Sequence, residues 1–310
     1  VVAAGSLLEF ALKDLSSFGV GRVSSLFVYP MSFDEFLLAT GQQGLWRAKQ
    51  DCNSSHPLLK AFYEKLVEAF RSFMLVGGMP EAVAAYAQTG SYRASSDIVN
   101  EILQGYEDDF AKYSAKANPV LLRQTLVSVA HQVGAKFVYS RVEGQYRSAE
   151  VKTALEMLRD AGLIIPAYHT DANGIPLGAE INERVVKYLV HDSGILLALL
   201  GIDDDTESLV KELMVENVVD LVDKGNVAEM IAGLEIMKCY SPQKRHQLYY
   251  WQNMNKGTCA EVDYIIAQGS RIVPIEVKSG TKGSMSSMYS LMKNPQKHIG
   301  RGVRCSLETF

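Results

Sequence analysis

The chain has 310 residues, of which 47% are hydrophobic and 21% are charged, and its formal net charge is −4. This composition is typical of a globular protein and excludes a disordered or collagen-like chain, while the length predicts two or three domains. A weakly acidic chain also argues against a uniformly basic nucleic-acid coat. No apolar stretch reaches the roughly 20 residues of a membrane span, so we expect no membrane contact. The four cysteines form no CxxC pair, which favours reduced thiols in the cytoplasm over a zinc site or disulfide framework.

The first 40 residues predict alternating strand and helix. The pattern is an apolar strand, a segment of helical spacing and a second short strand, at residues 1–6, 7–15 and 26–29. Ser32 and Glu35 then have the spacing of a capping box, which predicts a helix start. Because the sequence begins without an initiator methionine and both ends fall within a pattern, we expect a fragment of a longer protein.

The middle of the chain is predicted to be mainly helical. Residues 58–113 have helical spacing, interrupted at Gly77–Pro80, where two glycines break one helix and proline opens the next. Between residues 119 and 168, two helical segments at Leu121–Val133 and Ala149–Asp160 precede an extended run. Helix, turn, helix and extended wing are typical of a winged helix-turn-helix module.

Charge is segregated along the last third of the chain. Residues 203–223 predict a helix with eight acidic residues and one basic residue, and Asn226–Cys239 predicts another helix. Residues 271–304 contain seven lysines and arginines against one acidic residue. The near-neutral total therefore conceals an acidic helix and a basic tail.

Two β-rich runs, Glu261–Ala267 and Ile272–Lys278, are joined through Gly269-Ser270 and predict a β-hairpin. A two-residue turn fixes the register and therefore the two faces of the hairpin. One face is entirely apolar and should be the core side; it consists of Val262, Tyr264, Ile266, Val273, Ile275 and Val277.

The other face of this hairpin gathers charge at one end. The register places Asp263 opposite Glu276 and Glu261 opposite Lys278. Facing carboxylates destabilise a sheet, so a compensating cation is expected, and Mg²⁺ prefers carboxylate oxygens. Asp263 and Glu276 are the candidate metal ligands, and Lys278 could assist an attacking water or a phosphate. The alternative is a solvated hairpin end that Lys278 neutralises.

These residues resemble a known core. Asp263 and Glu276-Val277-Lys278, preceded by a helix that carries Glu229, are similar to the PD-(D/E)XK, or restriction-endonuclease-like, core. Much of the chain also resembles prokaryotic AAA-type ATPases that end in a domain of unknown function with that core. The matching stretches run in family order and are 21–23, 29–36, 77–81, 187–194, 250–251, 261–264 and 274–278.

The resemblance implies a mixed α/β protein in four parts. Residues 1–40 would be the C-terminal part of the ATPase core and residues 41–115 its helical lid. Residues 116–183 would be the winged-helix segment, and residues 184–310 the nuclease-like domain, truncated at its end. No G-x-x-x-x-G-K-[ST] motif occurs, so we expect ATP binding only in the full-length protein and no ATP hydrolysis by this chain.

Two further residues take their interpretation from the resemblance. Arg22 resembles a trans-acting arginine finger in position, and the alternative is a salt-bridged arginine at a strand edge. Glu229 would tune the metal site, although Met230 stands where the family usually has asparagine. Glutamate on a helix is otherwise commonly a surface residue.

Three functions remain open at this point. The first is a DNA-associated ATPase fragment whose nuclease-like domain uses Mg²⁺, with Asp263, Glu276, Lys278 and Glu229 in the site. The second is a non-catalytic module that binds DNA through basic residues of the winged helix and the tail, namely Arg147, Lys152, Arg159, Lys293, Lys297 and Arg301. The third is protein interaction, including self-association in a ring through the ATPase part.

Overall fold

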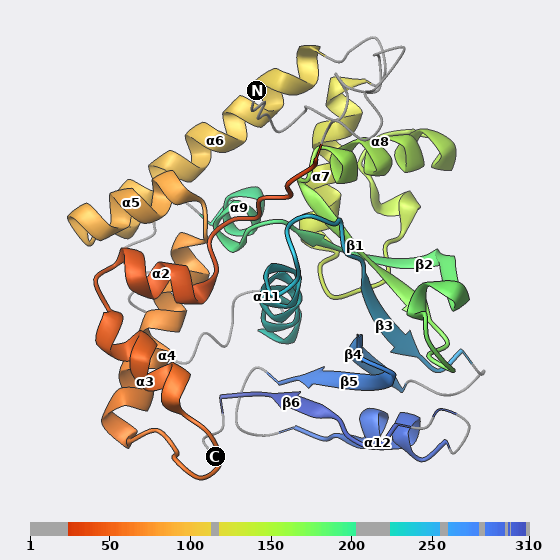
Figure 1. The fold of residues 1–310 in the computed structure, drawn as a ribbon. Coiled ribbons are helices and arrows are strands. Elements are labelled where there is room, and N and C mark those ends of the chain that lie inside the picture. The colour runs from red at the N-terminus through yellow and green to blue at the C-terminus, as the bar shows by residue number, and fades with distance from the viewer. Residues whose placement is uncertain are drawn as a thin grey trace.

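A computed structural model of the chain describes residues 24–112, 118–202, 224–254, 260–278, 283–294, 297 and 299–307. Figure 1 shows a group of helices beside a twisted sheet, with one helix, α11, between them. The architecture is mixed α/β, as predicted. In the part of the chain that the structure describes, no helix combines the length and apolar character that crossing a membrane requires.

The helical part contains five helices within residues 33–112. They are α2 (Phe33–Ala39), α3 (Gln43–Asp51), α4 (Lys60–Val76), α5 (Pro80–Thr89) and α6 (Tyr92–Lys112). The predicted capping box is present: Ser32 Oγ accepts a hydrogen bond from Glu35 N at 3.3 Å, and Glu35 Oε2 accepts one from Ser32 N at 2.7 Å. The predicted interruption is also confirmed, since α4 ends at Val76 and Pro80 is the first residue of α5.

The strand predicted at residues 26–29 does not form. Residues 24–29 have no regular secondary structure, and the side chains of Leu26 and Val28 are 67% and 84% exposed. Phe27 N donates to Pro242 O at 2.8 Å, which ties the segment to a loop rather than to a strand. An apolar run without a neighbouring strand gains no ladder of hydrogen bonds, so the apolar pattern alone does not produce a strand.

The next segment has the predicted order of helix, turn, helix and extended strand. Its elements are α7 (Pro119–His131), the 3₁₀ helix η1 (Tyr139–Arg141), α8 (Ser148–Asp160), β1 (Ile164–Thr170), the 3₁₀ helix η2 (Leu177–Glu180) and β2 (Ile181–Val190). β1 and β2 pair antiparallel. The predicted domain boundary at residue 183 falls inside β2, and both strands belong to the same sheet as the later strands.

The remaining elements complete a six-stranded mixed sheet of order β2-β1-β3-β4-β5-β6. They are α9 (Ser193–Leu199), α11 (Lys224–Lys238), β3 (Leu248–Gln252), β4 (Glu261–Gln268), β5 (Arg271–Val277), α12 (Ser286–Met292) and β6 (Val303–Cys305). β1 is parallel to β3 and β5 is parallel to β6, whereas the other neighbours are antiparallel.

The sheet is covered on both faces at the β4–β5 hairpin. Leu234 of α11 belongs to the same buried cluster as Tyr264 and Ile275, whereas Leu291 of α12 packs in a second cluster with Ile265. The helix α11 is the one that Figure 1 shows between the helical part and the sheet. Burial on both faces explains why the strands are apolar at successive positions rather than strictly alternating.

The predicted hairpin register is confirmed from Tyr264–Ile275 to Gln268–Arg271, but the face predicted for Val262 is wrong. Val262 packs in the second cluster, opposite Tyr264. The reason is a β-bulge, because Tyr249 pairs with Ile265 while Trp251 pairs with Val262, so β4 has one extra residue there. A bulge redirects the side chains that precede it, here those at the start of β4.

Candidate metal centre

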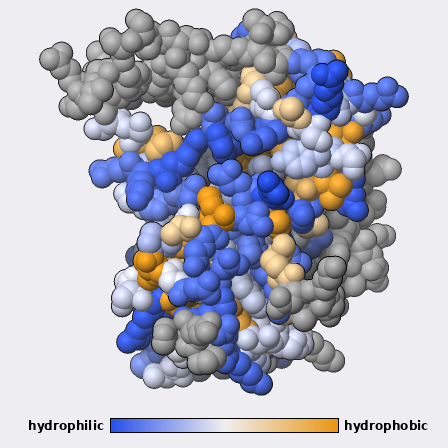
Figure 2. Space-filling view, turned by 90° about the vertical axis from the view of Figure 1, so that its right-hand side faces the viewer, coloured by the Kyte–Doolittle hydropathy of each residue, from blue (hydrophilic) through white to orange (hydrophobic). Residues whose placement is uncertain are grey.

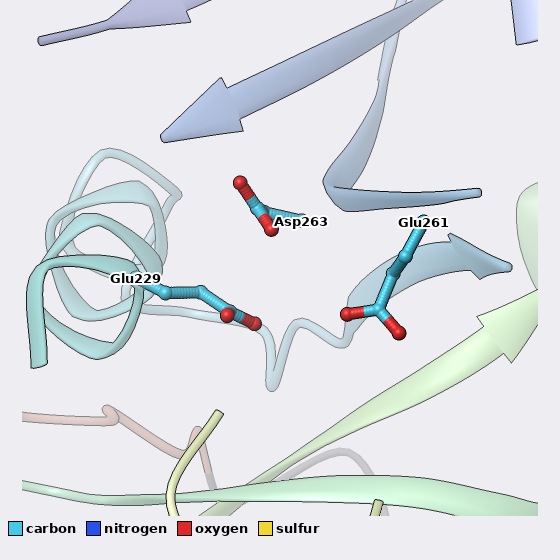
Figure 3. A group of neighbouring side chains, drawn as sticks. All are labelled: Glu229, Glu261 and Asp263. Atoms are coloured by element: carbon cyan, nitrogen blue, oxygen red, sulfur yellow. The ribbon is translucent and has the colours of Figure 1, made fainter. Parts of the chain in front are cut away.

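Three carboxylates converge where α11 meets the beginning of β4. Glu229 comes from α11, and Glu261 and Asp263 come from β4. One oxygen of each lies within 4.8 Å of the others. Figure 3 shows the side chains of Glu229 and Glu261 extending toward one another, with Asp263 between them in that view. Such an all-oxygen set has the ligand chemistry of a hard divalent cation.

Local packing explains why these residues meet. Gly233 of α11 lies so close to the sheet that a Cβ atom there would collide with the Tyr264 hydroxyl. That hydroxyl donates to the Glu229 carbonyl oxygen at 2.8 Å, which fixes the helix turn that carries Glu229. Because the bulge reverses the sides of β4 before Tyr264, Glu261 is directed to the α11 face.

Lys187 of β2 lies inside this carboxylate group. It is only 3% exposed, and its ammonium donates to Glu229 Oε1 at 2.8 Å and to Glu261 Oε1. The Nζ atom also lies 5.0 Å from the centre of the Tyr250 ring. Burial alone would lower the pKa of Lys187, but the charges of Glu229 and Glu261 outweigh it and raise that pKa above its usual value.

Asp263 and Glu276 connect this group to the following strand. Asp263 Oδ2 accepts a hydrogen bond from Val277 N at 2.7 Å. Glu276 is 4% exposed, and its Oε1 accepts from Lys278 Nζ at 2.6 Å. Its other oxygen, Oε2, is buried and has no hydrogen-bond partner among the described residues. A buried carboxylate oxygen without a partner is costly and calls for an explanation.

The carboxylates have more negative charge than their lysine neighbours neutralise. Three carboxylates, those of Glu229, Glu261 and Asp263, surround the single ammonium of Lys187, which leaves two net negative charges when all are ionised. Burial, opposed by Lys187 and reinforced by Asp263, raises the pKa of Glu229 to about 7. Burial also raises the pKa of Asp263 and of Glu276. Burial is the largest cause of all three shifts, so each carboxyl group takes up a proton more readily than it does in water.

The structure gathers the four residues proposed from sequence but arranges them differently. Asp263 belongs with Glu229 and Glu261, while Glu276 and Lys278 form an adjacent ion pair. The expected contact between Glu261 and Lys278 is replaced by the ion pair of Glu261 with Lys187. Met230, at the position where asparagine was expected, is a core residue with 1% exposure.

Lys187 is the site residue that sequence reasoning missed. It occurs within the stretch matched to the ATPase resemblance, but no role followed from that match. A usable signal was present: Lys187 is a single charge inside the otherwise uncharged run Val185–Val190, which forms most of a buried strand. A lysine at such a position is seldom fully buried unless it is paired.

The basic residues proposed to bind nucleic acid do not form one surface. Arg147 and Lys152 are exposed on α8, and Lys293 is exposed at the end of α12. Figure 1 shows α8 and α12 at opposite ends of the molecule. Figure 2, the face seen from the right of Figure 1, is largely hydrophilic, with hydrophobic residues scattered in small groups.

Four of the proposed basic residues already have partners within the chain. Lys152 pairs with Glu156 at 3.9 Å on the exposed side of α8. Arg159 forms an ion pair with the buried Asp160 at 2.8 Å, and Arg301 donates to Gln268. Lys297 was expected to contact DNA, but it is 8% exposed, and its ammonium donates to Asn173 Oδ1 at 2.9 Å and to the Asp171 carbonyl oxygen. Lys297 therefore anchors a loop, because its charge is directed to neutral oxygens inside the fold.

Four predictions lie outside the described residues. They are the strand at residues 1–6, the helical segment at residues 7–15, the arginine finger at Arg22 and the acidic helix over residues 203–223. All four stay predictions.

Comparison with protein families gives two matches, which follow each other along the chain. A domain of unknown function, DUF8612, matches residues 67–206, and a second, DUF4143, matches residues 224–309. The second match covers α11 and the β4–β5 hairpin, and the first includes Lys187. The site therefore contains residues from both matched regions. Comparison with curated proteins and with solved structures gives no match.

Proposed function

We propose that this chain is part of a DNA-associated AAA-type ATPase and that its last domain uses Mg²⁺ to cleave phosphodiester bonds. The single observation that carries the proposal is the partly buried group of Glu229, Glu261 and Asp263, which together with Lys187 has two net negative charges when all are ionised and lies beside the Glu276–Lys278 pair. The association with an ATPase is supported by the sequence resemblance of the helical part and by the order of its motifs.

The donor set fits a hard divalent cation. Glu229, Glu261 and Asp263 would hold it through carboxylate oxygens, and the buried Oε2 atom of Glu276 is still without a hydrogen-bond partner among the described residues. When bound, Mg²⁺ supplies Lewis-acid stabilisation of the negative charge that develops on a phosphate. Uncompensated carboxylates would instead repel a phosphodiester, so the cation is a condition for substrate binding.

Lys278 is the residue of this chain best placed to act on a substrate phosphate. Its side chain is 22% exposed, compared with 5% for Glu276, so Lys278 is the more accessible member of this ion pair. The ion pair of 2.6 Å with Glu276 holds the Lys278 ammonium in position. Lys278 can therefore donate to a phosphate oxygen or orient a water molecule, while Glu276 fixes its geometry.

The experiment compares Lys278→Met with Lys60→Met in the full 310-residue chain. Both variants remove one ammonium, but Lys60 is 88% exposed on α4 and belongs to no proposed site. Cleavage of labelled single- and double-stranded nucleic acids in Mg²⁺ should fall about 100-fold in Lys278→Met, the usual effect of losing one charge-stabilising donor. Lys60→Met should cleave normally. Equal cleavage by both variants would identify a contaminating nuclease and refute the proposal.

A second candidate function is nucleic-acid binding without cleavage, favoured by the exposed Arg147 and Lys152 at the start of α8. Each phosphate contact contributes about −0.9 to the slope of log affinity against log salt. The double variant Arg147→Ala/Lys152→Ala should therefore reduce that slope by about 2. Lys60→Ala, which changes a side chain that is 88% exposed on α4, should leave it unchanged. An unchanged slope in the double variant would remove α8 as the binding element.

A further inference from the structure

The position of Lys187 bears on how many cations the site takes. Its ammonium bridges Glu229 and Glu261, which otherwise would be two facing carboxylates with no cation between them. We infer that Lys187 occupies the place of a second cation, so that the site binds one divalent ion and not two. This inference rests on the proposed function, because it presumes that the carboxylates bind a divalent cation at all.

The charge balance supports a single ion. Three carboxylates and one ammonium leave two net negative charges, which one divalent cation neutralises. A second divalent ion would leave this partly buried site with two net positive charges, and uncompensated charge that is poorly screened by water is unfavourable. The ion pair of Glu276 with Lys278 adds no net charge to this balance.

The ammonium is also held in place. Lys187 lies on β2 between Val185 and Leu189, both buried in the main core, and the chain is 3% exposed at Lys187 itself. Tyr250 closes the site below the ammonium at 5.0 Å and is itself fully buried, with its hydroxyl 3.4 Å from the Val185 carbonyl oxygen. Moving Lys187 aside to admit another ion would break two ion pairs and leave a charge buried without a partner.

The pairing makes Lys187 a positioning residue as well. Glu229 is on a helix and Glu261 is at the start of a strand, 42 and 74 residues from Lys187 along the chain. One ammonium therefore fixes the distance between two elements that supply ligands. The buried Oε2 of Glu276 is an independent sign that the same region expects a ligand, and the Asp263 charge is among the causes that raise the pKa of Glu276.

The experiment is a titration with Mn²⁺, a paramagnetic substitute for Mg²⁺, followed by electron paramagnetic resonance and calorimetry. The unaltered chain should saturate at one equivalent, with the spectrum of an isolated ion. Lys187→Met has similar volume but no charge, and it should bind a second equivalent and show a coupled ion pair. Lys187→Arg keeps the positive charge and should bind one equivalent of Mn²⁺. The single variant Asp263→Asn, which keeps Lys187, should lose the equivalent of Mn²⁺ that binds at this site.

The outcomes separate this inference from the proposed function. An unaltered chain that binds no Mn²⁺ refutes the proposed function and the inference with it. Two equivalents in the unaltered chain, or one in both the unaltered chain and folded Lys187→Met, overturn the inference alone. If Lys187→Met does not fold, the spectrum of the unaltered chain decides, because an isolated ion supports a single site and a coupled pair overturns it.

Discussion

Two acidic sites involve strand β2 or the residues just after it, and they differ in how their negative charge is balanced. Asp192 lies just after β2 and is 2% exposed, and both its oxygens accept backbone hydrogen bonds, from Gly78 N at 2.6 Å and Ile195 N at 3.1 Å. At the candidate metal centre, by contrast, Lys187 faces an excess of carboxylates, and Glu276 has a buried oxygen without a partner among the described residues.

The difference indicates what each site does. A carboxylate whose two oxygens each accept an amide hydrogen bond is satisfied without a cation, and Asp192 caps α9 and holds the turn between α4 and α5. Gly77 has φ of +77°, and a Cβ atom there would collide with Asp192 Oδ1. Excess charge, raised carboxylate pKa values and a buried oxygen without a partner are instead the features on which the proposed cation site rests.

The largest effect on stability is expected from the loss of the Asp192 carboxylate. Asp192→Ala leaves two buried amides, those of Gly78 and Ile195, without acceptors, and each costs about 1–3 kcal/mol. We expect about 3 kcal/mol lower free energy of unfolding, measured by urea denaturation. Asp34→Ala is the control, because Asp34 pairs with Lys49 at the surface and its loss should cost about 0.5 kcal/mol. Equal losses in the two variants would contradict the assignment of Asp192.

The second effect should appear only when a cation is added. Asp263→Asn keeps an oxygen that can accept from Val277 N but removes one negative charge. We expect its stability without metal to change by less than about 1 kcal/mol. The unaltered chain should gain about 2.7 kcal/mol at 100 times the dissociation constant of Ca²⁺, and Asp263→Asn should lose that gain. Thermal unfolding with and without Ca²⁺ measures both. A Ca²⁺-induced gain that persists in the variant would place the ion elsewhere.

The sequence predicted what local spacing determines. Ser32 and Glu35 are three residues apart, and the turn at Gly269-Ser270 sets the hairpin register, so both features were found. The bulge that turns Val262 to the other face depends on pairing with β3, which no local pattern encodes. Whether a strand forms at residues 26–29 likewise depends on a neighbour distant in sequence.

Two lysines that are buried among the described residues, Lys187 and Lys297, show that the same limit applies within the site and outside it. Lys187 meets partners 42 and 74 residues away, and Lys297 meets partners 126 and 124 residues away. Sequence spacing identified Lys297 as a basic tail residue and gave Lys187 no role. A charge in sequence predicts a surface by default, and only the fold shows which charges become internal.

The smallest effect concerns the pH dependence beside Asp192. His191 is buried; its Nδ1 donates to Leu163 O at 3.0 Å, and Tyr106 lies 3.4 Å from its Nε2. Burial lowers the pKa of His191, opposed by the Asp192 charge and the Leu163 carbonyl and reinforced by Lys238. The unfolded chain therefore takes up this proton first, and stability falls as pH drops below about 6.5, the ordinary histidine value.

His191→Asn should weaken this pH dependence without removing the donor to the Leu163 carbonyl. Between pH 7 and pH 5, the free energy of unfolding should fall less in the variant than in the unaltered chain, because the variant has no imidazole to protonate on unfolding. Urea denaturation at several pH values measures the difference, and Cm at pH 7 reports any loss of packing separately. Parallel pH profiles would mean that the pKa of His191 is the same in the folded and the unfolded chain, which would contradict the lowering by burial. Below that pKa the folded chain would then hold a buried imidazolium, whose Nε2 is a donor and whose charge Asp192 would balance in addition to its two amide hydrogen bonds.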